Sequence, residues 1–148
     1  MEHRYVATIE APRSAVAEVL TDIGTYDRWL DFVERVEASD GGWIFTLRAQ
    51  VGPFARRKRL RVEETADAPL DHVRLERSER DDRDHAPWTF DAVLTPTTER
   101  AANSATEVTI TLSYGGKLWT SLLATVLDEQ LRTATKKLQT LAVHGGAG

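Results

Sequence analysis

The residues of this sequence that are capable of chemistry are scattered, and few of them stand at the spacing of a known site. The sequence contains no cysteine, which excludes disulfides, thiolate nucleophiles and cysteine-based metal sites. Its histidines, His3, His72, His85 and His144, show no paired spacing and are interpreted as surface residues. The acidic run 81–84 lacks the turn glycine and terminal glutamate of a calcium loop. We therefore predict no metal site and no cofactor.

Motifs for phosphate binding and for nucleophilic catalysis are also missing. The sequence has no Walker A loop, no dinucleotide-binding fingerprint and no Gly-x-Ser-x-Gly elbow. A linear sequence leaves open a triad assembled in space. If there is catalysis, we expect general acid–base chemistry, which needs only one or two well-placed proton-transfer groups. The residues leave open whether the chain is an enzyme.

Arg77 and Glu79 continue the alternation of Val73 and Leu75, so both are predicted to share the inward phase of a strand. An arginine in that position could hold a carboxylate or enolate oxygen of a ligand at the polar end of a pocket. The other interpretation is that the strand has left the core by residue 77, with both side chains solvated or paired.

The run 56–61 holds five basic residues among six. Strand alternation divides it between two faces, and we expect Arg57, Arg59 and Arg61 to point to solvent as a protected sheet edge. The alternative is a surface for anionic lipid, a ribosome or a protein partner. With a net charge of -4 and a pI near 5.6, the whole chain has no general attraction to DNA.

The elements that position these residues begin with a strand over residues 3–10, where Tyr5, Ala7 and Ile9 share one face. Pro12 is suited to the first turn of a helix, which Gly24 is predicted to end. A second short helix is predicted over about residues 26–30, with Thr25 able to cap it.

From Phe32 to residue 116 the apolar period is two, which predicts six further strands. Asp40-Gly41 is a strong signal for a hairpin turn between the first two of them. One apolar face and one polar face per strand are typical of an antiparallel sheet that is solvated on one side. The predicted inward positions are Trp43, Phe45, Leu47, Ala49, Val51, Leu60, Val62, Val73, Leu75, Trp88, Phe90, Ala92, Leu94, Val108, Ile110, Leu112 and Tyr114.

Residues 117–143 carry an apolar stripe at helical spacing, and a helix of that length would be roughly 40 Å long. A small sheet can cover such a helix only by wrapping around it. The stripe comprises Trp119, Leu123, Leu127, Leu131, Ala134, Leu138 and Leu141. We predict an α+β fold in one domain over residues 1–143, followed by a flexible tail over 144–148.

The stretch Ile9-Glu10-Ala11-Pro12-x-x-x-Val16-x-x-Val19-Leu20-x-Asp22, followed by Tyr26-Asp27-x-Trp29-Leu30, is the most specific part of the sequence. With the downstream strands and terminal helix, it resembles the START-related polyketide cyclase/dehydrase and lipid transport superfamily (SRPBCC). That resemblance covers nearly the whole chain. It implies the helix-grip fold, a curved antiparallel sheet around a long C-terminal helix with two short helices after the first strand.

The resemblance also implies a cavity between sheet and helix that binds or transports a hydrophobic small molecule, lipid-like or aromatic. The predicted ligand-binding residues are Phe45, Arg77, Trp88, Phe90, Tyr114, Trp119 and Leu123. Three alternatives stay open: a solid core, a polyketide cyclase or dehydratase acting in the same cavity, and an accessory protein that binds a membrane, ribosome or protein through its surface. The lack of cysteine and of an apolar leader or spanning segment favours a cytoplasmic protein.

Overall fold

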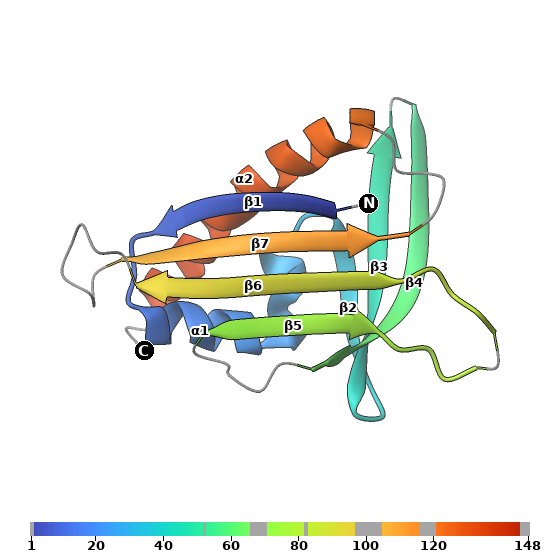
Figure 1. Ribbon diagram of the computed structural model, residues 1–148, viewed down its shortest axis with the longest axis horizontal. Helices are drawn as coiled ribbons and strands as arrows, with labels where there is room; N and C mark the ends of the chain where they lie inside the picture. Colours follow the sequence, from blue (N-terminus) through green and yellow to red (C-terminus); the bar gives the residue numbers. More distant parts are fainter. Residues whose placement is uncertain are drawn as a thin grey trace.

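The computed structural model describes residues 2–51, 53–65, 71–81, 83–96, 105–115 and 121–145. A strand and two short helices come first, six further strands follow, and a long helix ends the described chain, which is the predicted order (Figure 1). The elements are β1 (Glu2–Ile9), α1 (Arg13–Thr21), the 3-10 helix η1 (Ile23–Arg28), β2 (Val33–Ser39), β3 (Gly42–Val51), β4 (Phe54–Glu64), β5 (His72–Arg77), β6 (Trp88–Pro96), β7 (Thr106–Tyr114) and α2 (Ser121–Gly145).

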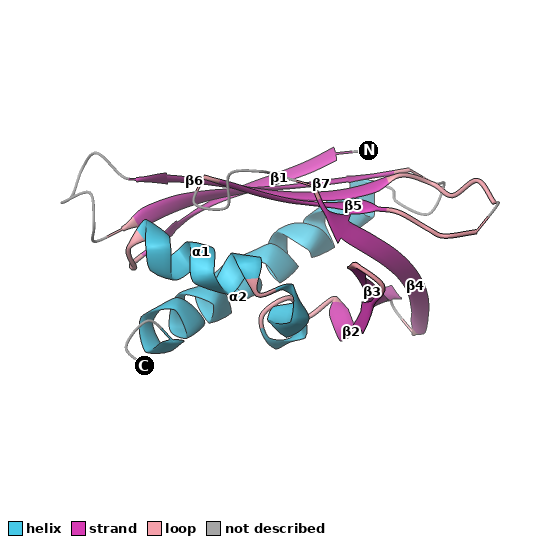
Figure 2. Cartoon of the chain, turned by 90° about the horizontal axis from the view of Figure 1, so that it is seen from below, coloured by secondary structure: helices cyan, strands magenta, loops and turns pink. Residues whose placement is uncertain are grey.

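The strands form one antiparallel sheet in the order β1-β7-β6-β5-β4-β3-β2, so that β1 and β2 are its edges. Figure 2 shows both α-helices on the same face of this sheet, while β2, β3 and β4 curl down beside them. The molecule is thus an α+β helix grip, as predicted.

The strand phases agree with the sequence pattern over the described side chains, which do not include those of the predicted inward residues Ala49 and Val51. In β7, for example, Val108, Ile110, Leu112 and Tyr114 are buried, whereas the residues between them are half-buried. Because side chains alternate between the two faces of a strand, this pattern fixes which face meets the helices. The buried strand residues on that face are Ile9, Val33, Phe45, Leu60, Val62, Val73, Leu75, Trp88, Phe90, Ala92, Leu94, Thr106, Val108, Ile110, Leu112 and Tyr114.

The predicted hairpin turn joins β2 to β3. Asp40 and Gly41 both have positive φ, 32° and 81°, and Ser39 pairs with Gly42 across the turn. Positive φ at both central residues is the geometry whose twist matches that of the flanking strands, which is why Asp-Gly predicts it.

The two short helices differ in detail from the prediction. Pro12 is the N-cap of α1 rather than part of its first turn, and α1 ends at Thr21, before Gly24. The second helix is a 3-10 helix that starts at Ile23, and the Thr25 hydroxyl donates to the Asp22 carbonyl instead of capping a backbone N–H. Tyr26 explains this tight connection, since its buried hydroxyl donates a 2.6 Å hydrogen bond to the Leu20 carbonyl.

The long helix α2 is confirmed over the described residues, and it runs on to Gly145, two residues beyond the predicted end. Leu127, Leu131, Ala134 and Leu138 are buried in the common core, as their spacing predicted. No helix in the described ranges combines the length and hydrophobicity that a membrane crossing requires.

Candidate functional site

The inner face of the sheet carries a row of neighbouring side chains at the end where β5 and β7 finish and β6 starts, on the right of Figure 1. Trp88 in β6 pairs with Tyr114 in β7, and Arg77 in β5 pairs with Val62 in β4. Val62 in turn pairs with Trp43. The register therefore places three of the predicted ligand-binding residues, Arg77, Trp88 and Tyr114, at one end of the grip.

Rings from the helical connection pack against two further predicted residues, Phe45 and Phe90. Tyr26 lies 5.9 Å from Phe45 and 5.6 Å from Phe90 between ring centroids. Trp29 lies 4.9 Å from Tyr26 and 6.3 Å from Phe90. These are edge or tilted contacts of the kind that stabilise aromatic cores. Phe45 and Phe90 are fully buried, so Tyr26 and Trp29 fill the space in front of them.

Trp88 connects this packed centre to the end of the grip. Its ring centroid is 6.2 Å from that of Phe45, and it keeps 7% exposure, against 6% for Tyr114. Trp119 lies outside the described residues, and for Leu123 the structure describes only its place in the backbone of α2.

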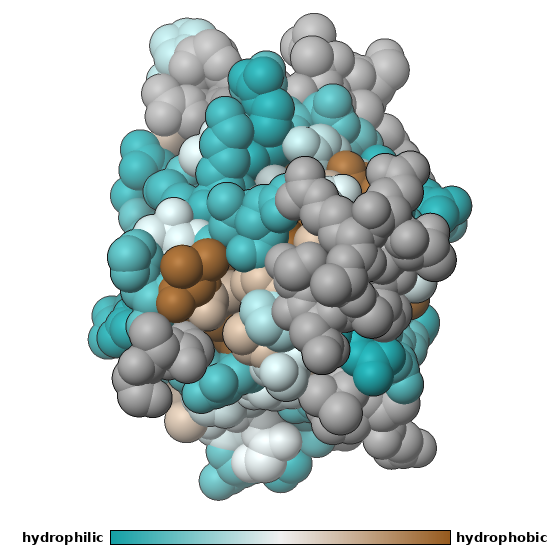
Figure 3. All heavy atoms as spheres, turned by 90° about the vertical axis from the view of Figure 1, so that its left-hand side faces the viewer, coloured by the Kyte–Doolittle hydropathy of each residue, from teal (hydrophilic) through white to brown (hydrophobic). Residues whose placement is uncertain are grey.

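A groove of about 170 Å³ lies elsewhere, on the outside of the helical layer. It is lined by Ala15, Glu18, Val19, Asp22, Thr25, Arg28 and Leu141. Its volume is below the roughly 300–1,000 Å³ of typical small-molecule sites. Figure 3 faces the end of the molecule near α1 and the end of α2, and among its coloured residues the apolar ones form small patches between hydrophilic ones.

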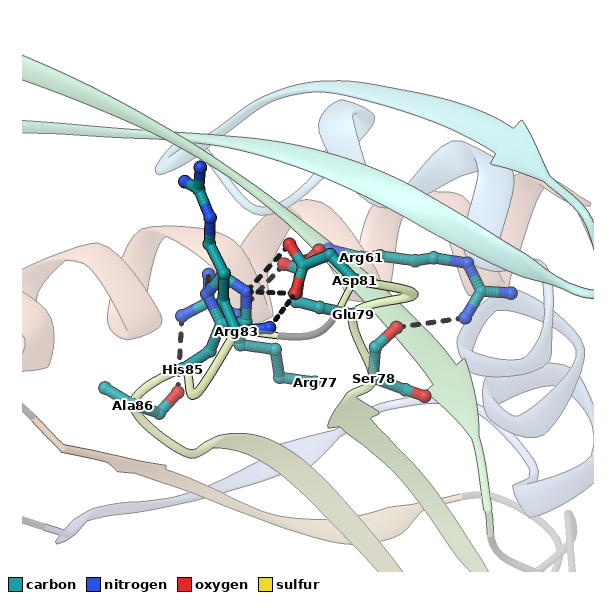
Figure 4. Close-up of polar contacts among 8 residues, drawn as sticks. All are labelled: Arg61, Arg77, Ser78, Glu79, Asp81, Arg83, His85 and Ala86. Atoms are coloured by element: carbon teal, nitrogen blue, oxygen red, sulfur yellow. Dashed lines mark hydrogen bonds and ion pairs between the residues drawn. The ribbon is translucent and has the colours of Figure 1, made fainter.

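Arg77 is paired, as one of the two interpretations of the sequence expected, but β5 extends through Arg77 opposite the buried Val62, so the strand has not left the core at that point. Its side chain is only 8% exposed, its Nε donates to Glu79 Oε1 at 3.0 Å, and its Nη1 donates to the Ala86 carbonyl at 3.2 Å. Its Nη2 lies 3.2 Å from Nδ1 of His85. Figure 4 shows these groups gathered where the chain leaves β5.

Glu79 also ends the pairing of β4 with β5. The Ser78 N–H donates to the Arg61 carbonyl, and the Arg61 N–H donates to Glu79 Oε1 at 3.0 Å. A side-chain carboxylate thus replaces the carbonyl that a longer strand would have supplied. The same oxygen neutralises Arg77 and satisfies a backbone donor.

Glu79, Asp81 and His85 form a group whose ligand atoms lie within 4.8 Å of one another. His85 Nε2 is 2.8 Å from Asp81 Oδ1, and this hydrogen bond, with a second from the Arg83 N–H, lowers the pKa of Asp81. The guanidinium of Arg77 already contacts both Glu79 and His85. Because a cation occupies that side of the group, the geometry gives no support to a metal ion there.

Arg61 contradicts the prediction that it points to solvent. Its side chain is 6% exposed and donates to the carbonyls of Asp40 at 2.7 Å, Ser78 at 3.0 Å and Ser39 at 3.3 Å. The β2–β3 turn and the chain after β5 both close over it. Alternation had placed Arg61 correctly on the outer face but could not show that this face is covered there.

Gly42 makes room for this arrangement. A Cβ at that position would lie 2.6 Å from the Val62 carbonyl oxygen and 2.8 Å from Nη2 of Arg61. By contrast, Arg57 and Arg59 are exposed, as predicted. Arg57 donates to Glu34 at 2.7 Å, and this hydrogen bond lowers the pKa of Glu34.

Two inward ionisable groups were missed. His3 was interpreted as a surface residue, but its side chain is 14% exposed and lies 3.4 Å from Asp128 Oδ1. His3 pairs with Leu112 in the sheet and lies on the same face of β1 as Tyr5. That shared strand phase was the sequence signal that could have identified His3 as an inward residue. Glu64 continues the inward phase of Leu60 and Val62 and pairs with Leu75. Although Glu64 is largely exposed, partial desolvation raises its pKa.

Comparison with solved structures gives the same architecture. A START superfamily protein from Mycobacterium smegmatis superposes with a TM-score of 0.71 at 10% identity, covering 97% of both chains. The Zhui aromatase/cyclase from a Streptomyces species has a TM-score of 0.65 at 15% identity, covering 96% of this chain and 93% of that one. A conserved protein from Geobacillus kaustophilus has a TM-score of 0.75 at 17% identity, covering 97% of this chain and 96% of that one.

The fold is therefore the START-like helix grip that these proteins share. At such low identity the likeness concerns the fold. No protein-family model and no curated protein matches the sequence.

Proposed function

We propose that this protein binds a hydrophobic small molecule, lipid-like or aromatic, at the Trp88–Tyr114 end of the helix grip. One observation carries the proposal: at one end of the sheet's inner face, Trp88 lies next to Tyr114 and Arg77 lies next to Val62. Aromatic rings offer a large contact area with defined orientation, and a site of this kind needs few polar groups.

The proposed lining follows from the packing. Trp88 and Tyr114 would contact the ligand, with Arg77 at the polar end. Phe45 would support the ring of Trp88, and Phe90 would belong to the packed centre behind it. Leu123 in α2 and Trp119, which lies outside the described residues, complete the proposed set. The cysteine-free sequence favours a reducing compartment, and we place the protein in the cytoplasm.

The test is titration of the purified protein with 1-pyrenebutanol, a neutral polycyclic probe. We expect saturable binding, followed by quenching of tryptophan emission, with Trp88→Ala weakening the affinity about tenfold because a central aromatic contact is lost. Val93→Ala is the matched control, since Val93 is 42% exposed on the opposite face of the same strand. No saturable binding, or equal weakening by both variants, would contradict the proposal.

A second candidate, acid–base catalysis of the cyclase or dehydratase type, is favoured by one observation. His3 and Glu64 both take the inward phase, at the two ends of a cross-strand row that runs through Leu112, Phe90 and Leu75. Because the two ends are roughly 19 Å apart, either group, but not both, could act on one bound substrate. A histidine and a carboxyl are suitable proton-transfer groups. Conversion of a bound poly-ketone would separate this function from simple binding.

A further inference from the structure

The charge at the polar end of the proposed site is already compensated within the protein. All three guanidinium nitrogens of Arg77 have partners: Glu79 for Nε, the Ala86 carbonyl for Nη1 and His85 for Nη2. Glu79 is itself fixed, because its Oε1 also accepts the Arg61 N–H. Neither member of the pair can turn toward a ligand without breaking contacts to the backbone.

An acidic ligand would meet an unfavourable environment here. To reach Arg77, its carboxylate would have to displace Glu79 or lie beside it, and two adjacent carboxylates repel each other when partly removed from water. Glu64, which faces inward from β4, adds a second acidic group on the described inner face. A neutral ligand incurs neither penalty.

We propose that Glu79, by neutralising Arg77, makes this site selective for uncharged hydrophobic ligands over their carboxylic acid analogues. This inference rests on the proposed function and deepens it by naming the ligand class and the residue that determines it. It replaces the expectation that Arg77 holds a ligand carboxylate.

The experiment compares 1-pyrenebutanol with 1-pyrenebutyrate, which share ring system and alkyl chain and differ at the terminal group. Both are titrated at neutral pH and at about 0.15 M salt, where the net charge of distant surface groups is largely screened. We expect the wild-type protein to bind the alcohol about tenfold or more tightly than the acid, which is the effect of one uncompensated charge interaction.

Glu79→Gln is the decisive variant, because glutamine keeps an oxygen that accepts the Arg61 N–H but removes the charge that neutralises Arg77. The acid should then bind about tenfold more tightly than it does to the wild type, through a charge-assisted hydrogen bond to Arg77. The alcohol should bind within about threefold of its wild-type affinity, since no charge acts on it. In the double variant Arg77→Met, Glu79→Gln the gain for the acid should disappear.

Glu76→Gln is the matched control. It removes the same charge from β5, the strand that Glu79 follows, but Glu76 lies on the outer face, paired with Arg74 at 2.9 Å. It should leave the ratio of the two affinities unchanged. If it raises acid binding as much as Glu79→Gln does, net charge rather than the Arg77–Glu79 pair sets the selectivity, and the inference is overturned.

The failures of the two proposals are distinguishable. If neither probe binds, the proposed function fails and takes this inference with it. If the alcohol binds but the wild-type protein binds the acid equally or more tightly, only the inference fails, and this comparison needs no variant to fold. An unchanged acid affinity in a folded Glu79→Gln protein would also overturn it.

Discussion

At the scale of single residues, Arg61 does more for the fold than its place in a basic run indicates. Its guanidinium joins the β2–β3 turn, through Ser39 and Asp40, to the chain after β5, through Ser78. It also pairs with Glu63 at 3.2 Å. One side chain thus fixes how β4 lies against the segments that border it.

Replacing Arg61 with methionine should lower the free energy of unfolding by about 1–3 kcal/mol, because partly buried carbonyls lose a charged donor. Arg59→Met is the matched control two residues away on the same strand, where an exposed side chain should change stability by less than about 0.5 kcal/mol. Urea unfolding measures both. Equal, small effects would mean that the carbonyls around Arg61 are satisfied without it.

Tyr26 provides a second test, through pH. Burial, and secondarily the charge of Glu64, raise the pKa of Tyr26 well above 10. The folded protein therefore disfavours the phenolate, so the contribution of Tyr26 to stability is complete below pH 10 and is lost as pH rises from 10 through its folded-state pKa.

Tyr26→Phe should lose about 1 kcal/mol at neutral pH, where it lacks the hydrogen bond to Leu20. As pH rises above 10, its stability should fall less than that of the parent, because phenylalanine has no proton to release. Denaturant unfolding at a series of pH values measures the difference, and comparison with the parent cancels the other titrating groups. Parallel curves for the two proteins would show that Tyr26 ionises as easily folded as unfolded.

At the scale of elements, the docking of α2 on the sheet depends on its buried stripe. Leu131 is fully buried and Leu138 likewise, whereas Val143 in the last described turns is 47% exposed. The sheet curves around this helix, so a cavity in the stripe cannot be closed by movement of one strand alone.

Leu131→Ala should therefore destabilise the protein by about 2–5 kcal/mol, the range for leucine truncation in packed cores. Val143→Ala removes apolar atoms from the same helix at an exposed position and should change stability by less than about 0.5 kcal/mol. Thermal unfolding followed by circular dichroism compares the two. A Leu131→Ala protein that melts with the parent would mean that α2 is not held by this stripe.

At the scale of the whole molecule, the aromatic rings divide the grip into a packed centre and a less enclosed end. Tyr26 and Trp29 come from the helical connection and close over Phe45 and Phe90. The proposed ligand site therefore lies toward Trp88, Tyr114 and Arg77 rather than along the whole inner face. The Arg77–Glu79 pair gives that end its proposed preference for neutral ligands.

Much of this architecture was determined by the sequence alone. The order of strand, short helices, strands and long helix was predictable, as were the Asp40-Gly41 turn and the inward phase of β1 and of the strands from β3 to β7 over their described side chains. These features depend on periodicity and on φ preferences, which are properties of residues that are close together in the chain.

Only the tertiary structure decided which charges are buried and how they are paired. Arg61 bonds to carbonyls 22, 21 and 17 residues away in the chain, and alternation predicts the face of a strand but not whether another segment covers it. Arg77 had two open interpretations because its partners, Glu79, His85 and Ala86, lie in an irregular stretch without a period. A local pattern carries no information on such contacts, since they form only when curvature of the sheet brings distant segments together.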